Sequence, residues 1–206
     1  MSQSLTKSGN NATITVSGSS DRSYTIAYTI YPDGVVDMAV NFQSGRSTNY
    51  RVGLAMQFGS GFQRVEYYGR GPWANYPDRE DGSYLGRFDS NVDDLFEEYT
   101  HPQTNGDHQD LRDLTLKSSK CNLKIETQGD VSFSMCHYDE SAWKEKPWYT
   151  KLNNKDLTRS GNVYAHFDAA LSGVGSGSCG PGTLSKYIPS SSTTYSYTLR
   201  FTPTAK

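Results

Sequence analysis

Apolar and polar residues alternate with a period of two along many short stretches of this sequence. Residues 12–16 read Ala-Thr-Ile-Thr-Val, and every second residue from Val36 to Phe42 is apolar. Because successive side chains of a strand point to opposite faces of a sheet, this pattern predicts β-strands. The strands that we expect span residues 12–16, 24–31, 35–42, 51–58, 64–68, 123–126, 131–137, 163–171 and 195–201. A helical apolar stripe is weak throughout, and its best candidate, residues 92–99, predicts a short helix of about two turns.

Turn-forming residues separate several of these stretches. The tripeptide Pro-Asp-Gly at 32–34 combines a preset φ, a side chain that caps the turn and a residue that accepts positive φ, so it predicts a hairpin. The tripeptide Gln-Gly-Asp at 128–130 predicts a second hairpin in the same way.

Two long stretches carry no clear strand pattern and are expected to be loops. Residues 69–116 are rich in charge and aromatic rings, and residues 173–192 are rich in Gly and Ser. Loops of such length are uncommon in compact domains and often carry function. The sequence therefore predicts an all-β protein, with residues 12–206 forming one antiparallel β-sandwich domain and residues 1–11 forming a disordered or engineered start.

Composition and charge exclude several classes of protein. The 206 residues are 34% hydrophobic and 13% aromatic, which is too aromatic for a disordered chain. The apolar runs are far shorter than the roughly 20 residues of a membrane span, so we expect no membrane partner. The 20 basic and 22 acidic residues leave a net charge of −2, so we expect no nucleic-acid partner either.

The spacing of cysteine and histidine indicates no metal site. The three cysteines form no C-x-x-C pair, and the four histidines never fall at the spacing of a zinc motif. These residues are Cys121, Cys136 and Cys179, and His101, His108, His137 and His166.

Carboxylates cluster at residues 78–81, 93–98 and 107–113. A retaining glycosidase needs two carboxyl groups about 5–5.5 Å apart, one on each side of the scissile bond. A sequence with so many acids always offers candidate pairs, so the clusters alone do not indicate catalysis. Acids on solvated loop surfaces, paired with arginines, are the simpler interpretation. We therefore expect loop surfaces here and no catalytic pair.

Aromatic residues also gather in and beside the loops. Sugars present flat C–H faces between rims of hydroxyls, so sugar sites pair an aromatic platform with polar side chains. A small secondary core under a long loop would use the same residues, and both interpretations remain open from composition. The residues are Tyr67, Tyr68, Trp73, Tyr76 and Tyr84, and then Trp143, Trp148 and Tyr149.

A series of motifs gives more specific information. Residues 68–79, Y-G-R-G-P-W-A-N-Y-P-D-R, closely resemble the signature Y-G-x-G-P-x-E-N-Y-x-D-R in the C-terminal domain of large bacterial β-galactosidases, of glycoside hydrolase family two. Ala74 and Thr104 stand where two of the family motifs have Glu. Further motifs of the family follow in order at 101–106 (H-P-Q-T-N-G), 110–112 (D-L-R), 166–168 (H-F-D), 173–175 (G-V-G) and 178–181 (S-C-G-P).

The resemblance implies an antiparallel supersandwich similar to the galactose mutarotase fold. In the family, the catalytic glutamates and the catalytic magnesium lie in a separate (β/α)₈ barrel, which 206 residues cannot hold as well. It therefore implies no catalytic residue, metal or other cofactor in this chain. The implied partners are the catalytic barrel and a galactoside.

The resemblance also implies site residues. The family's sandwich contributes an aromatic platform to the aglycone side of the sugar pocket, and counting back from Asp168 places this platform at Tyr164. We expect Tyr164 to bind carbohydrate together with Trp73, His108 and Asp168.

The resulting hypothesis is a domain of a bacterial lactose-metabolising enzyme, cytoplasmic or periplasmic, that is inactive alone. A free-standing carbohydrate-binding module is the alternative. A less favoured one is an aldose-1-epimerase-like enzyme, which would use His108 with Asp110 or Asp168 as acid and base.

Overall fold

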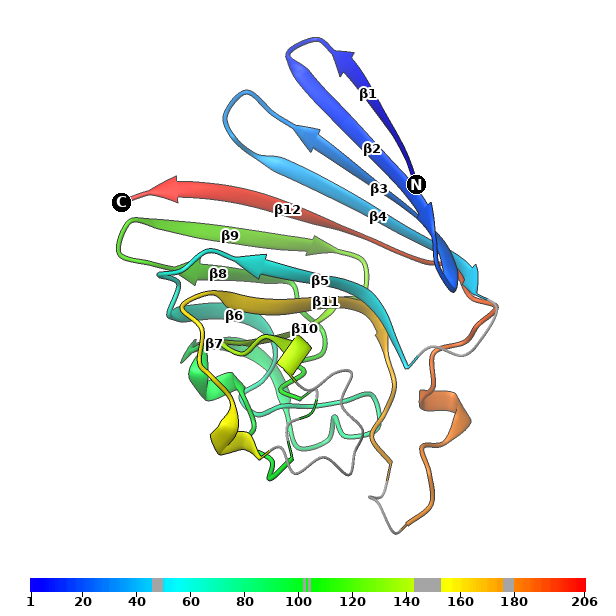
Figure 1. Ribbon diagram of the computed structural model, residues 1–206, viewed down its shortest axis with the longest axis vertical. Coiled ribbons are helices and arrows are strands. Elements are labelled where there is room, and N and C mark those ends of the chain that lie inside the picture. Colours follow the sequence, from blue (N-terminus) through cyan, green and yellow to red (C-terminus); the bar gives the residue numbers. More distant parts are fainter. Residues whose placement is uncertain (46–49, 102, 104, 143–152, 176–179) are drawn as a thin grey trace.

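The computed structural model describes residues 1–45, 50–101, 103, 105–142, 153–175 and 180–206. Two antiparallel sheets face each other (Figure 1). The larger has nine strands in the order β1-β2-β3-β4-β12-β9-β8-β6-β7, with bounds β1 Ser2–Ser8, β2 Asn11–Ser19, β3 Arg22–Ile30, β4 Val36–Gly45, β12 Tyr195–Ala205, β9 Cys121–Gln128, β8 Asp113–Lys117, β6 Arg64–Gly71 and β7 Tyr84–Asn91. The smaller has the order β10-β11-β5, with bounds β10 Ser132–Cys136, β11 Val163–Leu171 and β5 Arg51–Phe58.

The all-β class and the antiparallel sandwich predicted from the sequence are confirmed, and each expected strand has a counterpart. The predicted loop at 69–116, however, contains strands β7 and β8.

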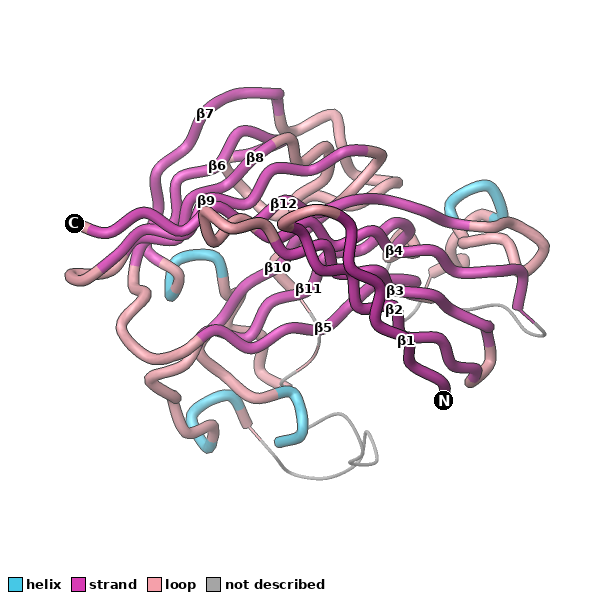
Figure 2. Tube along the Cα trace, turned by 90° about the horizontal axis from the view of Figure 1, so that it is seen from above, coloured by secondary structure: helices cyan, strands magenta, loops and turns pink. Residues whose placement is uncertain are grey.

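Helices among the described residues are single 3-10 turns outside the sheets, and the expected helix at 92–99 is one of them (Figure 2). These turns are η1 Asp93–Leu95, η2 Glu140–Ala142, η3 Asn154–Asp156 and η4 Ser185–Tyr187. The likeness to the galactose mutarotase sandwich remains a prediction.

The first eleven residues are ordered, which contradicts the disordered start that was one of the two expectations for them. Ser2–Ser8 form β1, which pairs in register with β2 from Ser2↔Ser17 to Ser8↔Asn11. Gly9, at φ 59°, makes the tight turn between these strands. All seven residues of β1 are exposed, so the strand lacks the apolar alternation by which a sequence reveals a strand.

One of the two predicted hairpins is present and the other is wrong. At residues 32–34 the chain turns back from β3 to β4, with Gly34 at φ 85° and the amide of Val35 donating to Asp33 Oδ1 at 3.1 Å. At residues 128–130 the chain instead leaves the nine-stranded sheet at β9 and enters the three-stranded sheet at β10. The turn signal is real, but the local sequence does not determine which sheet the second strand joins.

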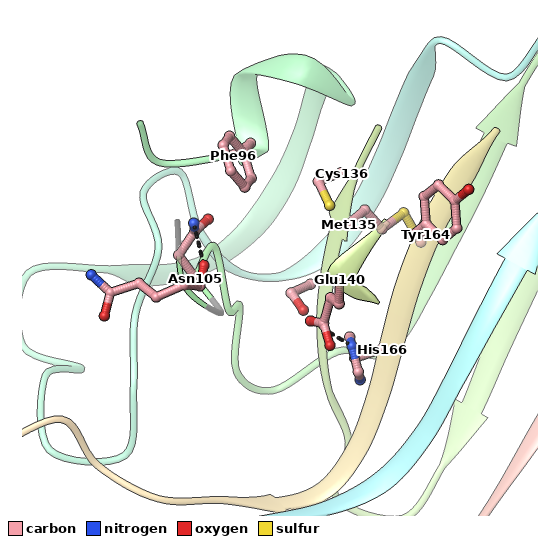
Figure 3. A pocket seen from close by; sticks show the side chains of 9 residues that line it. Phe96, Asn105, Met135, Cys136, Glu140, Tyr164 and His166 are labelled. Atoms are coloured by element: carbon pink, nitrogen blue, oxygen red, sulfur yellow. Dashed lines mark hydrogen bonds and ion pairs between the residues drawn. The ribbon is translucent and has the colours of Figure 1, made fainter. Parts of the chain in front are cut away.

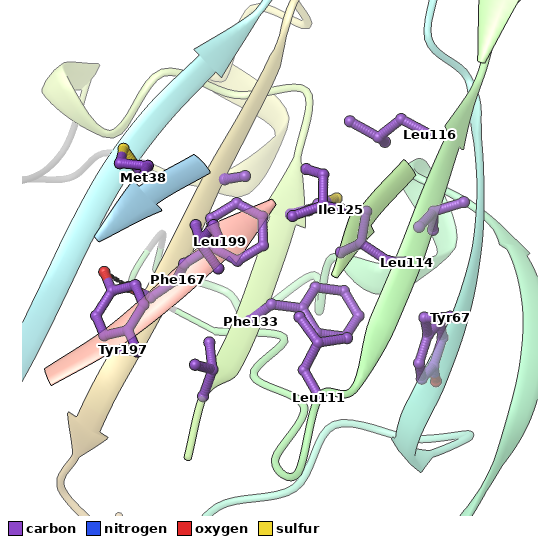
Figure 4. Close-up of a cluster of buried hydrophobic side chains, with 14 of the residues drawn as sticks. Met38, Tyr67, Leu111, Leu114, Leu116, Ile125, Phe133, Phe167, Tyr197 and Leu199 are labelled. Atoms are coloured by element: carbon purple, nitrogen blue, oxygen red, sulfur yellow. Dashed lines mark hydrogen bonds between the residues drawn. The ribbon is translucent and has the colours of Figure 1, made fainter. Parts of the chain in front are cut away.

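The core lies between the two sheets (Figure 4). Phe133 and Phe167 from the smaller sheet and Leu199 from the larger one have no exposed surface. Burying each such side chain stabilises the fold by roughly 1.5–3 kcal/mol. The Tyr197 hydroxyl on β12 donates to the Phe167 carbonyl on β11 at 2.8 Å, which ties the two sheets together inside this core.

The smaller sheet covers only part of the larger one. Leu199, Met38, Tyr28, Ile14 and Leu5 stand in register across β12, β4, β3, β2 and β1 on the inner face. Their exposure rises along this row, from 0% at Leu199 and 2% at Met38 to 37% at Ile14 and 71% at Leu5. Strands β1 to β4 fan away from the smaller sheet in Figure 1, which explains the gradient.

Candidate functional site

The outer face of the three-stranded sheet carries the candidate site. On β11, Val163, Ala165 and Phe167 point into the core, so the alternate residues Tyr164 and His166 point outward. Their partners across the sheet are modest in size, and these are Gln57 and Cys136 beside Tyr164, and Ala55 and Ser134 beside His166. The central row therefore has room around its rings.

Two cavities open beside this row, and Tyr164, His166 and Glu140 line both of them. The wider cavity, of about 370 Å³, lies toward β5 and is also lined by Gln57. This volume is within the range of small-molecule sites. The narrower cavity lies toward β10, where Phe96 and Asn105 form the opposite wall (Figure 3).

A ladder of charged side chains runs from the cavity into the protein. His166 Nε2 lies 2.9 Å from Glu140 Oε1, and Arg51 Nη1 lies 3.7 Å from the same oxygen. Arg51 Nε in turn lies 2.9 Å from Asp168 Oδ2. Burial raises the pKa of Asp168 to about 6, although the charges of Arg51 and His166 act to lower it.

A second buried carboxyl group lies next to this ladder. Asp107 is fully enclosed and accepts hydrogen bonds from Ser132 Oγ at 3.0 Å and from the Gln109 side chain. Burial, reinforced by the charge of Asp168, raises the pKa of Asp107 well above its ordinary value. Two buried acids with raised pKa values, Asp107 and Asp168, therefore lie close together under the outer face.

Comparison with known proteins decides the family. The family described as "Beta galactosidase small chain" matches residues 2–201. The chain belongs to the β-galactosidase small-chain family.

Curated relatives agree with this assignment. The chain is 33% identical over 147 residues to the "Beta-galactosidase" of Kluyveromyces lactis, an alignment that covers 66% of this chain and 13% of that protein. It is 28% identical over 159 residues to that of Staphylococcus xylosus, covering 76% and 16%. It is 29% identical over 164 residues to that of Actinobacillus pleuropneumoniae, covering 79% and 15%. The chain thus spans less than a fifth of the length of these relatives.

The motifs that resemble the β-galactosidase family hold the loops around the outer face. Asn75 is buried, donates to the carbonyls of Arg70 and Trp73 at 3.1 and 3.0 Å, and accepts from the amide of Gln109 at 2.9 Å. The Asp78 carboxylate accepts from the amides of Val174 and Gly175 at 3.0 and 2.8 Å. These side chains fix loop backbones to one another, as capping side chains do.

Asn105 performs the same task at the cavity wall. Its Oδ1 accepts from the Glu97 amide at 3.0 Å, and its Nδ2 donates to the carbonyls of Glu97 and Gln103 at 3.1 and 3.0 Å. The neighbouring motif position Thr104 lies outside the described residues. The family motifs therefore mark residues that hold the site in place more than residues that face a ligand.

The structure places the four expected carbohydrate-binding residues in three different settings. Tyr164 lines both cavities, as a platform would. Trp73 is 68% exposed but lines neither cavity. His108 and Asp168 are each only 1% exposed, so the structure corrects the expectation that they face a sugar.

His108 has a role inside the fold. Its ring stacks on Phe133 at 5.2 Å between centroids, and its Nδ1 and Nε2 lie 3.0 and 3.3 Å from the carbonyls of Gly106 and Pro72. Burial lowers the pKa of His108, although the carbonyls of Gly106 and Pro72 act to raise it. An epimerase that used His108 with Asp168 would therefore have both groups sealed from its substrate.

The remaining aromatic residues divide between core and surface. Tyr67 is buried against Phe88, His108 and Phe133, so for this ring the secondary-core interpretation is correct. Tyr84 is 62% exposed. Trp143, Trp148 and Tyr149 lie outside the described residues.

Sequence reasoning missed Glu140 and His166 as site residues. The period of two on β11 could have found His166, since it stands two residues after Tyr164. Glu140 comes from a turn, and no local pattern connects it to β11. Within the described ranges, no group of three or more His, Cys, Asp or Glu side chains could hold a metal ion, and no helix is long and apolar enough to span a membrane.

Proposed function

We propose that this chain is a non-catalytic domain of a β-galactosidase-type glycoside hydrolase, where it packs on the catalytic barrel and forms the acceptor side of the sugar site through Tyr164. Its family membership and its relatives support the enzyme class. The small fraction of each relative that it spans supports a division of labour with other parts of the enzyme.

The observation that carries the acceptor role is the position of Tyr164. Its ring lines a cavity of about 370 Å³ on the outer face, beside the polar groups of Glu140, His166 and Gln57. An aromatic face next to hydrogen-bonding side chains suits the apolar face and hydroxyl rim of a pyranose.

The acids of the outer face support a non-catalytic role. Asp139 and Glu140 line the wider cavity but are neighbours on one turn, so they do not flank a bond from two sides. Asp107 and Asp168 are enclosed. We further propose that the reacting acids and the magnesium of the enzyme belong to the barrel and that this chain needs no cofactor of its own.

Two assays test the proposal. The isolated chain should not hydrolyse a nitrophenyl galactoside, and turnover at ordinary enzyme rates would refute the division of labour. In the complete enzyme, Tyr164→Ala should weaken acceptor binding by about 1–3 kcal/mol, because the stacking face is lost. Trp73→Ala is the matched control, since this exposed ring lines neither cavity, and it should leave acceptor binding unchanged.

A further inference from the structure

We propose that Glu140 and His166 select the sugar that stacks on Tyr164 by hydrogen bonding to its hydroxyl groups. This inference rests on the proposed function, because it takes Tyr164 as the sugar platform. The ligand class is a pyranose acceptor with free hydroxyls along the rim next to its apolar face.

The pair stands where a stacked sugar would present that rim. His166 follows Tyr164 by two residues on β11, which places the two side chains on one face about 6.6 Å apart along the strand. Glu140 reaches the same place from η2, and all three side chains line both cavities. Figure 3 shows them around the narrower one. The small neighbours Ala55 and Ser134 leave the space beside His166 open.

The hydrogen-bonding chemistry of the pair fits hydroxyl groups. A proton on His166 Nε2 donates to Glu140 Oε1 across 2.9 Å, and a neutral imidazole in this tautomer has an acceptor at Nδ1. Among the described residues, this Nδ1 has no hydrogen-bond partner. A carboxylate accepts several hydrogen bonds, so Glu140 can accept from a hydroxyl while it holds His166. The pair thus presents acceptors to neighbouring hydroxyls of one sugar.

Partial burial makes this pair selective. The side chains of Glu140 and His166 are 20% and 13% exposed, so a ligand in the cavity reaches them while bulk water is largely displaced. Arg51, paired with Asp168, places a positive charge 3.7 Å from the Glu140 carboxylate. A sugar that lacks the hydroxyl matching His166 Nδ1 would leave this partly buried acceptor unpaired, which penalises its binding.

The test uses the complete enzyme with a nitrophenyl galactoside as donor and glucose as acceptor. In the transfer, the galactosyl carbon leaves the nitrophenol oxygen and bonds to an acceptor hydroxyl, whose proton ends on nitrophenol. Glu140→Gln and His166→Gln should each lower transfer to glucose about 10-fold. Transfer to methanol, which has no pyranose ring, is the reference reaction, so the measured quantity is the ratio of transfer to glucose over transfer to methanol.

Glu126→Gln is the matched control for the change in charge. Glu126 lies on β9 in an exposed pair with Lys124 at 2.7 Å, and its substitution should leave transfer to both acceptors unchanged. A series of deoxyglucoses then identifies the hydroxyl that the pair binds. For that acceptor the wild type should already be about 10-fold poorer than with glucose, and the two variants should add no further loss.

The outcomes separate this inference from the proposed function. Transfer to glucose that is unchanged in Glu140→Gln and His166→Gln, or reduced equally for glucose and methanol, would overturn the selective pair. If Tyr164→Ala lowers glucose transfer in the same experiment, the platform stands and only the pair is wrong. If Tyr164→Ala has no effect on glucose transfer, the proposed function itself fails.

Discussion

The two faces of β11 place opposite kinds of chemistry on consecutive residues. On the inner face, Val163, Ala165 and Phe167 are at most 1% exposed and belong to the apolar core. On the outer face, Tyr164 and His166 line cavities, and Asp168 holds Arg51. Since the period of a strand is two, one nine-residue segment both anchors the sandwich and carries the candidate site.

The two faces of β11 differ in the interactions that hold their side chains in place. Inner residues are held by packing, which depends on shape and volume. Outer residues are held by charge and by hydrogen bonds from loops that arrive from distant parts of the chain, such as Glu140 from η2. Substitutions on the inner face should therefore change stability, whereas those on the outer face should change pH dependence and ligand binding.

The largest effect is expected on the inner face. Phe167→Ala should lower the free energy of unfolding by about 3–5 kcal/mol, because it removes a fully buried ring and leaves a cavity between the sheets. Denaturant titration followed by tryptophan fluorescence measures this loss. A loss below about 1 kcal/mol would mean that the two sheets are not packed through this ring.

The next effect is a pH dependence under the outer face. A buried acid whose pKa is raised keeps its proton in the folded state at pH values where the unfolded chain has lost it. Its stabilising contribution is complete below the unfolded pKa of 3.8 and is lost as the pH rises through the folded value, which for Asp168 is about 6. From pH 4 to pH 6, the titration of Asp168 should therefore lower the free energy of unfolding by about 2 kcal/mol.

A matched variant tests this pH dependence, which includes the effect of the Asp168 charge on the titration of Asp107. His108, whose pKa is lowered by burial, contributes in the opposite sense over an overlapping range, so wild type must be compared with Asp168→Asn at each pH. The free energy of unfolding of the wild type should fall relative to that of the variant from pH 4 to pH 6. If the free energies of unfolding of the two proteins change in parallel with pH, the pKa of Asp168 is not raised.

A smaller effect is expected where β5 passes beside the charge ladder. A Cβ at Gly53 would lie 2.1 Å from Asp168 Oδ1 and 2.4 Å from the Phe167 carbonyl, so Gly53→Ala should cost about 1–3 kcal/mol of unfolding free energy. Gly59, just beyond the same strand, has no atom within 4 Å of such a Cβ. Thermal unfolding of Gly59→Ala should match the wild type, and an equal loss in both variants would point to backbone flexibility in place of the clash.

These expectations also show how far the sequence alone could predict the molecule. The alternation in residues 163–171 is enough to predict β11 and to separate its two faces. It cannot show that Asp168 is enclosed, because the groups beside its carboxylate, Arg51 and Gly53 on β5 and the buried Asp107, come from distant parts of the chain. Asp168 was therefore expected at a surface and is in fact enclosed.

Local signals also failed where pairing is decided at long range. The turn at 128–130 was predicted as a hairpin, but β9 pairs with β8 and β12 while β10 pairs with β11. Strand β1 was missed because it is exposed on both sides. Tyr164 was identified as a site residue only through the resemblance to a family, and Glu140 was not identified. No local sequence pattern around either residue predicts a cavity.

The smallest effect on stability is expected at Tyr164, and it tests the comparison most directly. This half-buried ring lies on the outer face, one residue from fully buried Val163, so Tyr164→Ala should lower the free energy of unfolding by about 1 kcal/mol or less. The same denaturant titration that measures Phe167→Ala supplies the value. A loss comparable to that of Phe167→Ala would mean that the Tyr164 ring is a core residue, and the separation of stability and binding between the two faces of β11 would then be wrong.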